Sequence, residues 1–114
     1  MENLFYSKSQ TSIWKFITLR GTAAKAVWTP TTSTRIVLTG LDITAVNPIG
    51  TIQFRFGNVA GAVIAEYNIA STIGFSGLNP RFQGIESTAY DRELYVEATS
   101  AATDGWRITA YGFE

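Results

Sequence analysis

The sequence predicts an all-β protein: a single antiparallel β-sandwich, jelly-roll-like, with about eight strands. Short segments in which apolar and polar residues alternate recur every 8–12 residues or so, the spacing typical of sandwiches and barrels. Clusters of Gly, Asn, Asp and Pro separate these segments, as turns do. No stretch of about 12 residues has the periodicity of an amphipathic helix. The 114 residues, 46% of them hydrophobic and 16% charged, suffice for one core.

The first expected strands are residues 13–19 and 24–28. Segment 13–19 (IWKFITL) is also compatible with one or two turns of helix, but its β-branched and aromatic residues favour a strand. Residues 35–39 and 41–44 flank Gly40. A glycine inside such a run is typical of a bulge or bend, so these residues form either one long strand or two.

The clearest alternation lies in residues 51–56. Residues two apart share one side of a strand, so Ile52, Phe54 and Phe56 face inward while the polar residues between them face outward. Weaker candidate strands are residues 62–67 and 73–75.

The last two expected strands are residues 93–98 and 106–111. The Asp104-Gly105 pair between them predicts a hairpin, because this dipeptide favours the tight turns of antiparallel strands. The alternation also predicts a set of buried residues. They are Ile36, Leu38, Ile52, Phe54, Phe56, Leu94, Val96, Trp106 and Ile108.

Residues 11–114 are expected to form the sandwich, and residues 1–10 an N-terminal segment of different character. Leu4, Phe5 and Tyr6 stand there in a polar setting. An ordinary frayed terminus does not need them, so the segment is either an edge strand of its own domain or an arm that adds to a neighbour's sheet. No signal peptide is expected, and no apolar run approaches the roughly 18 residues of a membrane span.

The composition argues against an enzyme. The chain has no cysteine and no histidine, which excludes a thiolate zinc site, a cysteine nucleophile and a Ser-His-Asp triad. A hydrolase with two carboxylates is the remaining enzymatic alternative. Asp91, Glu93 and Glu97 share one face of a strand, but no calcium-loop pattern accompanies them, so a solvated or subunit-facing stripe is expected. We therefore expect no cofactor, no metal and no catalytic residue.

The charge pattern bears on the expected partners. Nine basic and nine acidic residues give a net charge of zero, so no overall field attracts nucleic acid or a membrane. The basic residues are concentrated in residues 1–35 and the acidic ones in 86–114. These regions either pair within one sandwich or form complementary poles that guide subunits together.

Aromatic side chains at outward positions predict a covered surface, since a non-polar outer face is unusual on a soluble monomer. The expected interface comprises Tyr95, Tyr111 and Phe113 together with Leu4, Phe5 and Tyr6.

Several segments also resemble a known class of protein. Residues 39–44 (TGLDIT), the following Asn47-Pro48, the strand 51–56 and the final WRITAYGFE of residues 106–114 are similar to small virion proteins of tailed bacteriophages. The resemblance covers residues 34–114. It implies a β-sandwich that decorates the capsid or builds minor capsid or tail parts, often as a trimer, in contact with itself and other virion proteins. Such a protein is assembled in the host cytoplasm and found in the virion. The alternative is a carbohydrate- or receptor-binding β-sandwich that uses exposed tryptophan or tyrosine, with a glycan as its partner.

Overall fold

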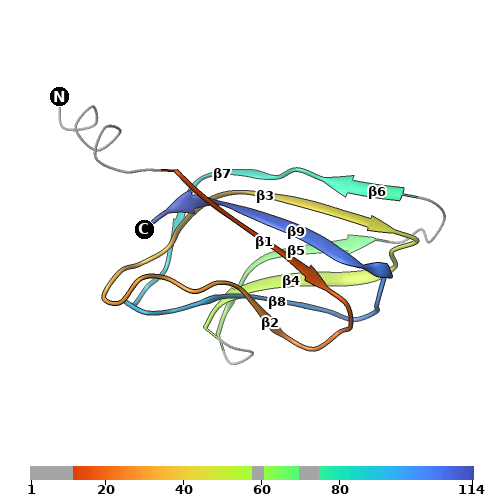
Figure 1. Cartoon of the computed structure of the whole chain (residues 1–114), viewed down its shortest axis with the longest axis horizontal. Helices are drawn as coiled ribbons and strands as arrows, with labels where there is room; N and C mark the ends of the chain where they lie inside the picture. The colour runs from red at the N-terminus through yellow and green to blue at the C-terminus, as the bar shows by residue number, and fades with distance from the viewer. Residues whose placement is uncertain (1–11, 58–60, 70–74) are drawn as a thin grey trace.

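The structure, a computed structural model, describes residues 12–57, 61–69 and 75–114 (Figure 1). These residues contain no helix and form two antiparallel sheets packed as a sandwich, which confirms the predicted fold class. Nine strands are present, one more than expected. They are β1 (Ile13–Leu19), β2 (Lys25–Trp28), β3 (Val37–Val46), β4 (Gly50–Phe56), β5 (Val63–Ile69), β6 (Phe75–Leu78), β7 (Arg81–Glu86), β8 (Leu94–Ala98) and β9 (Thr103–Phe113). Leu4, Phe5 and Tyr6 lie outside the described residues.

The chain passes repeatedly from one sheet to the other. Sheet A has the strand order β1-β9-β3-β6, and β7 pairs with another part of β3; sheet B has the order β2-β8-β4-β5. Strands β1, β2, β3 and β4 therefore alternate between the sheets, as do β8 and β9, which gives the jelly-roll-like winding. Within sheet B, β4 and β5 pair directly as a hairpin.

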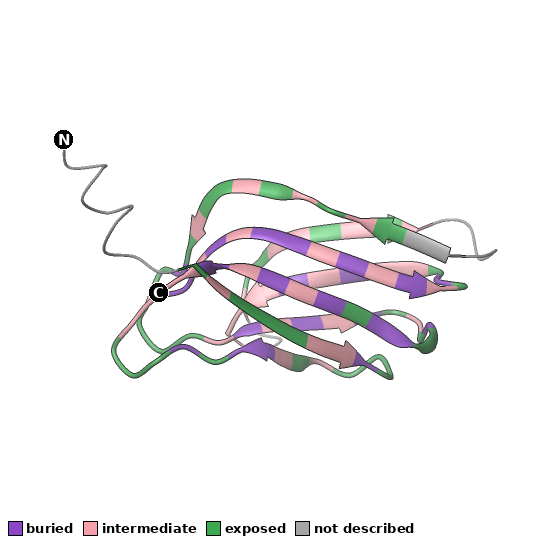
Figure 2. Cartoon of the chain, turned by 45° about the horizontal axis from the view of Figure 1, so that its top comes forward, coloured by how far each residue is buried: buried purple, intermediate pink, exposed green. Residues whose placement is uncertain are grey.

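The core lies between the sheets and follows the period of two that the sequence shows. Along β3 and β9, buried residues alternate with half-buried or exposed ones (Figure 2). All the predicted core residues except Phe56 are buried, among them Phe54 and Trp106 with 0% exposure. Phe56 is half-buried because it ends β4 at the rim of the sandwich, where it still packs against the core.

Strand β3 is one long strand with an irregularity at the predicted place. Its register with β9 shifts between Leu38 and Gly40. An added Cβ at Gly40 would lie 2.9 Å from Cδ of Arg81. The glycine thus leaves room for the Arg81 side chain to cross the outside of sheet A.

One sequence prediction in the second half of the chain is wrong. The Asp104-Gly105 hairpin does not form, because β8 pairs in sheet B and β9 pairs in sheet A. Both residues have positive φ, 60° and 89°, and they bend the chain near the start of β9. The pair therefore supplies a local bend, and the connection crosses between the sheets.

The segment after β5 also differs from expectation. Of the strand expected at residues 73–75, residues 73 and 74 lie outside the described residues, and Phe75 begins β6, Phe75–Leu78. Strand β7 was not predicted. Gly84 of β7 has φ 131° and interrupts the alternation that would have revealed the strand.

Candidate functional site

Two exposed aromatic side chains mark the outer face of sheet A. Trp14 is 67% exposed and Phe16 53% exposed, both on β1. Trp14 pairs directly with Tyr111 of β9, so their side chains share that outer face. We call Trp14, Phe16 and Tyr111 the aromatic strip. β1 is the edge strand of sheet A, so the strip ends at an open side of the sheet.

The other two tryptophans belong to the core. Trp28 donates from Nε1 to Oε2 of Glu114 at 2.8 Å, and Trp106 donates from Nε1 to the Ser100 carbonyl at 3.0 Å. Both indole N–H groups are satisfied within the chain and both side chains are buried. Trp14 therefore differs from them in having its ring in solvent.

A polar cluster fixes the inner end of the aromatic strip. Asp42 accepts a hydrogen bond from the Tyr111 hydroxyl at 2.6 Å. Its other oxygen accepts from Asn79 Nδ2 at 2.8 Å and from Arg81 Nη2 at 3.1 Å. The Arg81 guanidinium also lies over the Tyr111 ring, 5.3 Å from its centroid. Tyr111 is thereby held in one orientation from two sides.

The same contacts shift the titration of two groups. Hydrogen bonds from Asn79 and Tyr111, with a smaller contribution from Arg81, hold the pKa of Asp42 below its ordinary value. The hydrogen bond to Asp42, followed by partial burial, raises the pKa of Tyr111. Asp42 is thus ionised and Tyr111 protonated across the neutral range.

The structure brings only some of the predicted interface residues together. Tyr111 and Phe113 lie on β9 in sheet A, whereas Tyr95 lies on β8 in sheet B, so Tyr95 is separated from the other two by the sandwich. All three are half-buried. The Tyr95 hydroxyl donates to Glu93 at 3.3 Å, and the charge of Glu93 raises the pKa of Tyr95. Their role in an interface stays a prediction.

Sequence reasoning missed Trp14 and Phe16 as surface residues. The signal was present in the alternation of segment 13–19, in which both faces of the strand are largely apolar. Only one face of an edge strand can meet its own core. The second apolar face is therefore the sign of an uncovered surface.

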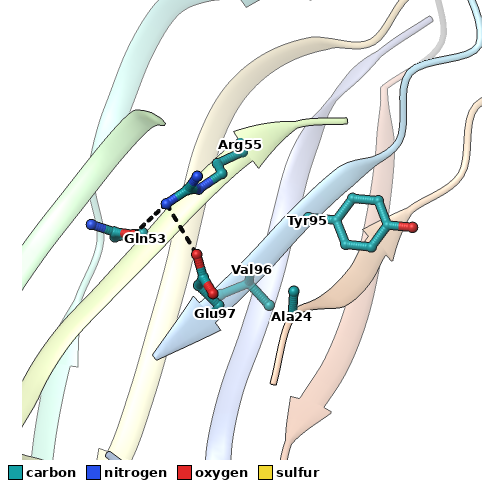
Figure 3. Close-up of a pocket in the computed structure, with 6 residues that line it drawn as sticks. All are labelled: Ala24, Gln53, Arg55, Tyr95, Val96 and Glu97. Carbon is teal, nitrogen blue, oxygen red and sulfur yellow. Dashed lines mark hydrogen bonds and ion pairs between the residues drawn. The ribbon is translucent and has the colours of Figure 1, made fainter. Parts of the chain in front are cut away.

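The outer face of sheet B has a different character. Arg55 pairs with Glu97 at 3.0 Å and donates to Gln53 at 2.8 Å (Figure 3). Gln53 in turn donates to Glu66. A shallow depression there has no space for a water molecule. It is lined by Ala24, Gln53, Arg55, Tyr95, Val96 and Glu97. This face is occupied by contacts within the chain.

The carboxylates of the acidic stripe are also engaged locally and do not converge. Asp91 accepts from the Ser33 amide at 2.6 Å, and Glu93 accepts from the Thr29 hydroxyl at 2.6 Å. Glu97 is paired with Arg55 as described. Over the described ranges, no three acidic side chains gather as metal ligands would.

A hollow of about 310 Å³ lies at the end of the sandwich where two loops meet the end of β9. We call it the loop-end hollow. Its lining residues are Thr34, Arg35, Val37, Glu86, Tyr90 and Glu114. Tyr90 is 59% exposed at its border. The hollow therefore combines charged side chains with an accessible aromatic ring.

Comparison with known proteins gives similarity of structure alone. No protein-family model and no curated protein matches the sequence. One similar solved structure is from the work "Bacillus endospore appendages form a novel family of disulfide-linked pili", with 18% identity, 91% of this chain and 85% of that chain covered, and a TM-score of 0.48. Another is CsCBM6-3 from Clostridium stercorarium in complex with cellobiose, with 12% identity, 91% and 86% coverage and a TM-score of 0.48. The Cyanophage Pam1 capsid asymmetric unit is a third, with 16% identity, 91% and 84% coverage and a TM-score of 0.46.

At these identities and TM-scores the similarity carries no inference about what this chain does. Among the described residues, no helix is long and apolar enough to cross a membrane.

Proposed function

We propose that this protein is a non-enzymatic virion structural protein, a capsid decoration or minor capsid subunit that acts by packing against copies of itself and other virion proteins. The observation that carries the proposal is the aromatic strip at the open edge of sheet A. Trp14 and Phe16 present adjacent rings to solvent from an edge strand. Soluble monomers rarely leave an apolar edge strand uncovered, because it pairs readily with another chain.

The physical basis of such packing is burial of these rings together with completion of the open sheet edge. Fully burying an aromatic side chain of this size stabilises an association by roughly 1.5–3 kcal/mol. The zero net charge adds no long-range repulsion between copies. In this role the protein is assembled in the host cytoplasm and resides in the virion, without nucleic acid or membrane as partners.

The mass of the protein in solution, measured by multi-angle light scattering, tests this proposal. We expect the parent to be an oligomer, for example a trimer, and the Trp14→Glu/Phe16→Glu double variant to be a monomer with unchanged thermal unfolding. The control is Val63→Glu, which introduces one glutamate, against two in the double variant, at another exposed apolar position on an edge strand, β5, where Val63 is 42% exposed. The control should keep the parent's mass. A parent that is a monodisperse monomer at high concentration, with no affinity for any particle, would contradict the proposal.

The N-terminal segment enters the same experiment. Deletion of residues 1–10, which removes Leu4, Phe5 and Tyr6, should weaken the oligomer if the segment acts as an arm. An unchanged mass would assign the association to the sandwich alone.

A second candidate function is binding of a glycan or receptor. The observation that favours it is the loop-end hollow, with the exposed Tyr90 ring at its border. Such a module would be monomeric and retained by an immobilised glycan, so mass and retention together separate the two functions.

A further inference from the structure

The loop-end hollow is built from three separate parts of the chain. Val37, at the start of β3, pairs with both Glu86 of β7 and Phe113 of β9. The Asp91 amide donates to the Thr34 carbonyl at 3.0 Å, which ties the loop before β8 to the loop before β3. Backbone contacts therefore hold these walls together, while the exposed Tyr90 lies on the loop between β7 and β8.

Arg35 supplies the hydrogen-bond donors of the hollow. Its guanidinium lies over the Tyr90 ring, 4.6 Å from the centroid. Its buried Nε has no hydrogen-bond partner, and the group forms no ion pair with a carboxylate in the part of the chain that the structure describes. Stacking engages the face of a guanidinium and leaves the in-plane N–H groups for another acceptor.

Two carboxylates supply acceptors. Burial opposes the charge of Glu114, but hydrogen bonds from Thr31 and Trp28 outweigh it and hold the pKa of Glu114 below its ordinary value. Glu114 is therefore ionised and fixed in orientation. Glu86 also lines the hollow and is exposed.

This combination selects a class of ligand. Arg35, Glu86 and Glu114 together carry a net charge of −1, which disfavours anions, and the guanidinium disfavours simple cations. A neutral molecule with several hydroxyl groups satisfies both kinds of side chain, because each hydroxyl both donates and accepts. The Tyr90 ring offers an apolar face for C–H groups. The volume of about 310 Å³ lies at the lower end of the range of ligand pockets.

We infer that the loop-end hollow binds one neutral sugar residue of a glycan, with Arg35 donating to its oxygens, Glu86 accepting from its hydroxyls and the Tyr90 ring packing on its face. This inference rests on the second candidate function and is independent of assembly through the aromatic strip.

Ligand-observed saturation-transfer NMR tests it, since the method works on monomers and on large assemblies. The probes are D-glucose, D-galactose, D-mannose and N-acetylglucosamine, with N-acetylneuraminate and free lysine as charged comparisons, each titrated against the parent and four variants. At least one sugar should receive saturation from the parent. Glu86→Gln and Tyr90→Ala should each weaken its binding by roughly tenfold, as expected for loss of one charged hydrogen-bond acceptor or of one ring contact.

Two controls separate the hollow from other surfaces. Tyr90→Phe keeps the ring and should bind within about twofold of the parent. Trp14→Ala removes an exposed aromatic outside the hollow and should leave binding unchanged. The three substituted residues are all exposed, and circular dichroism checks that each of the four variants is folded.

Three results would overturn the inference, and each points to a different error. Preferential binding of N-acetylneuraminate or free lysine, lost in Tyr90→Ala, would show that the ligand class is wrong. Sugar binding lost in Trp14→Ala but kept in Tyr90→Ala would leave glycan binding standing and place it on the aromatic strip. Absence of transfer to every sugar would remove both this inference and the second candidate function, while light scattering decides assembly separately.

Discussion

The outer faces of the two sheets differ although their inner faces are alike. In sheet B, Arg55 and Glu97 form an ion pair whose side chains are only 19% and 29% exposed. In sheet A, Trp14 and Phe16 are more than half exposed and lie at the open edge. One face is completed by contacts within the chain, and the other presents apolar surface. Of the two outer faces, that of sheet A therefore carries the larger exposed aromatic side chains.

The position of the strands explains this difference. Strands β4 and β8 lie inside sheet B, so an outward polar residue such as Gln53 faces Glu66 on one side and Glu97 on the other. Cross-strand pairs of this kind stabilise a sheet. Among the described strands, β1 has a neighbour on one side only, so its outward residues lack a cross-strand partner on the other side.

A truncation in the core that both sheets share should cause the largest loss of stability. Phe54→Ala removes a side chain with 0% exposure from the centre of β4 and should lower the free energy of unfolding by roughly 3–5 kcal/mol. Urea denaturation followed by fluorescence measures it. A change of a few tenths of a kcal/mol would mean that the register of β4 is wrong by one residue.

A substitution where β9 lies against β3 should cause the next largest loss of stability. A Cβ at Gly112 would overlap the Val37 carbonyl oxygen, so Gly112→Ala must push the two strands apart. We expect a loss of roughly 1–3 kcal/mol in the same assay. Gly21→Ala is the control, because a Cβ there meets nothing within 4 Å. Equal stability of the two variants would contradict the close approach of these strands.

Removing polar contacts from the two outer faces should lower the free energy of unfolding by smaller and unequal amounts. Asp42→Ala deprives Tyr111, Asn79 and Arg81 of their shared acceptor and should cost about 1 kcal/mol. Glu97→Ala breaks one surface ion pair and should cost about 0.5 kcal/mol. If the order is reversed, the cluster on sheet A does not fix Tyr111 as we describe.

The pH dependence of stability should test the Asp42–Tyr111 contact on the outer face of sheet A. Since the pKa of Asp42 is lowered in the folded state, its stabilising contribution is present above the unfolded value of about 3.9 and is lost as pH falls through the lower folded value. The pKa of Tyr111 is raised, so its contribution is present below about pH 10 and is lost above that. Melting temperatures of the parent should fall at both extremes. Asp42→Asn should flatten both limbs, and an unchanged profile would contradict the shifts.

Salt should have the smallest effect on association. If burial of the aromatic strip drives assembly, raising the salt concentration from 0.05 to about 0.5 M leaves the oligomer intact in light scattering. If the basic first third of the chain meets the acidic last part of a neighbour, the oligomer weakens as salt rises. That result would move the interface from the aromatic strip to the charged regions.

The sequence by itself determined the fold class and most of the core. Alternation with a period of two is a local property, so Ile52 and Phe54 or Leu94 and Val96 could be assigned to the inner face without knowing their neighbours. Gly40 likewise predicted a bend inside β3, because glycine interrupts a strand wherever another chain segment must approach closely.

Only the tertiary structure decided which strands share a sheet, and with that the candidate sites. Tyr95 and Tyr111 have the same alternation in the sequence but lie on opposite sides of the sandwich, because β8 and β9 belong to different sheets. Trp14 is exposed and Trp28 is buried, although both lie on short apolar strands. Whether each indole is covered depends on the strands that pack around it. Arg35 is far from Glu86 and Tyr90 in the sequence, and the pairing of β3 with β7 brings them together. Pairing between distant strands is not encoded in any one segment, since it results from the packing of the whole chain.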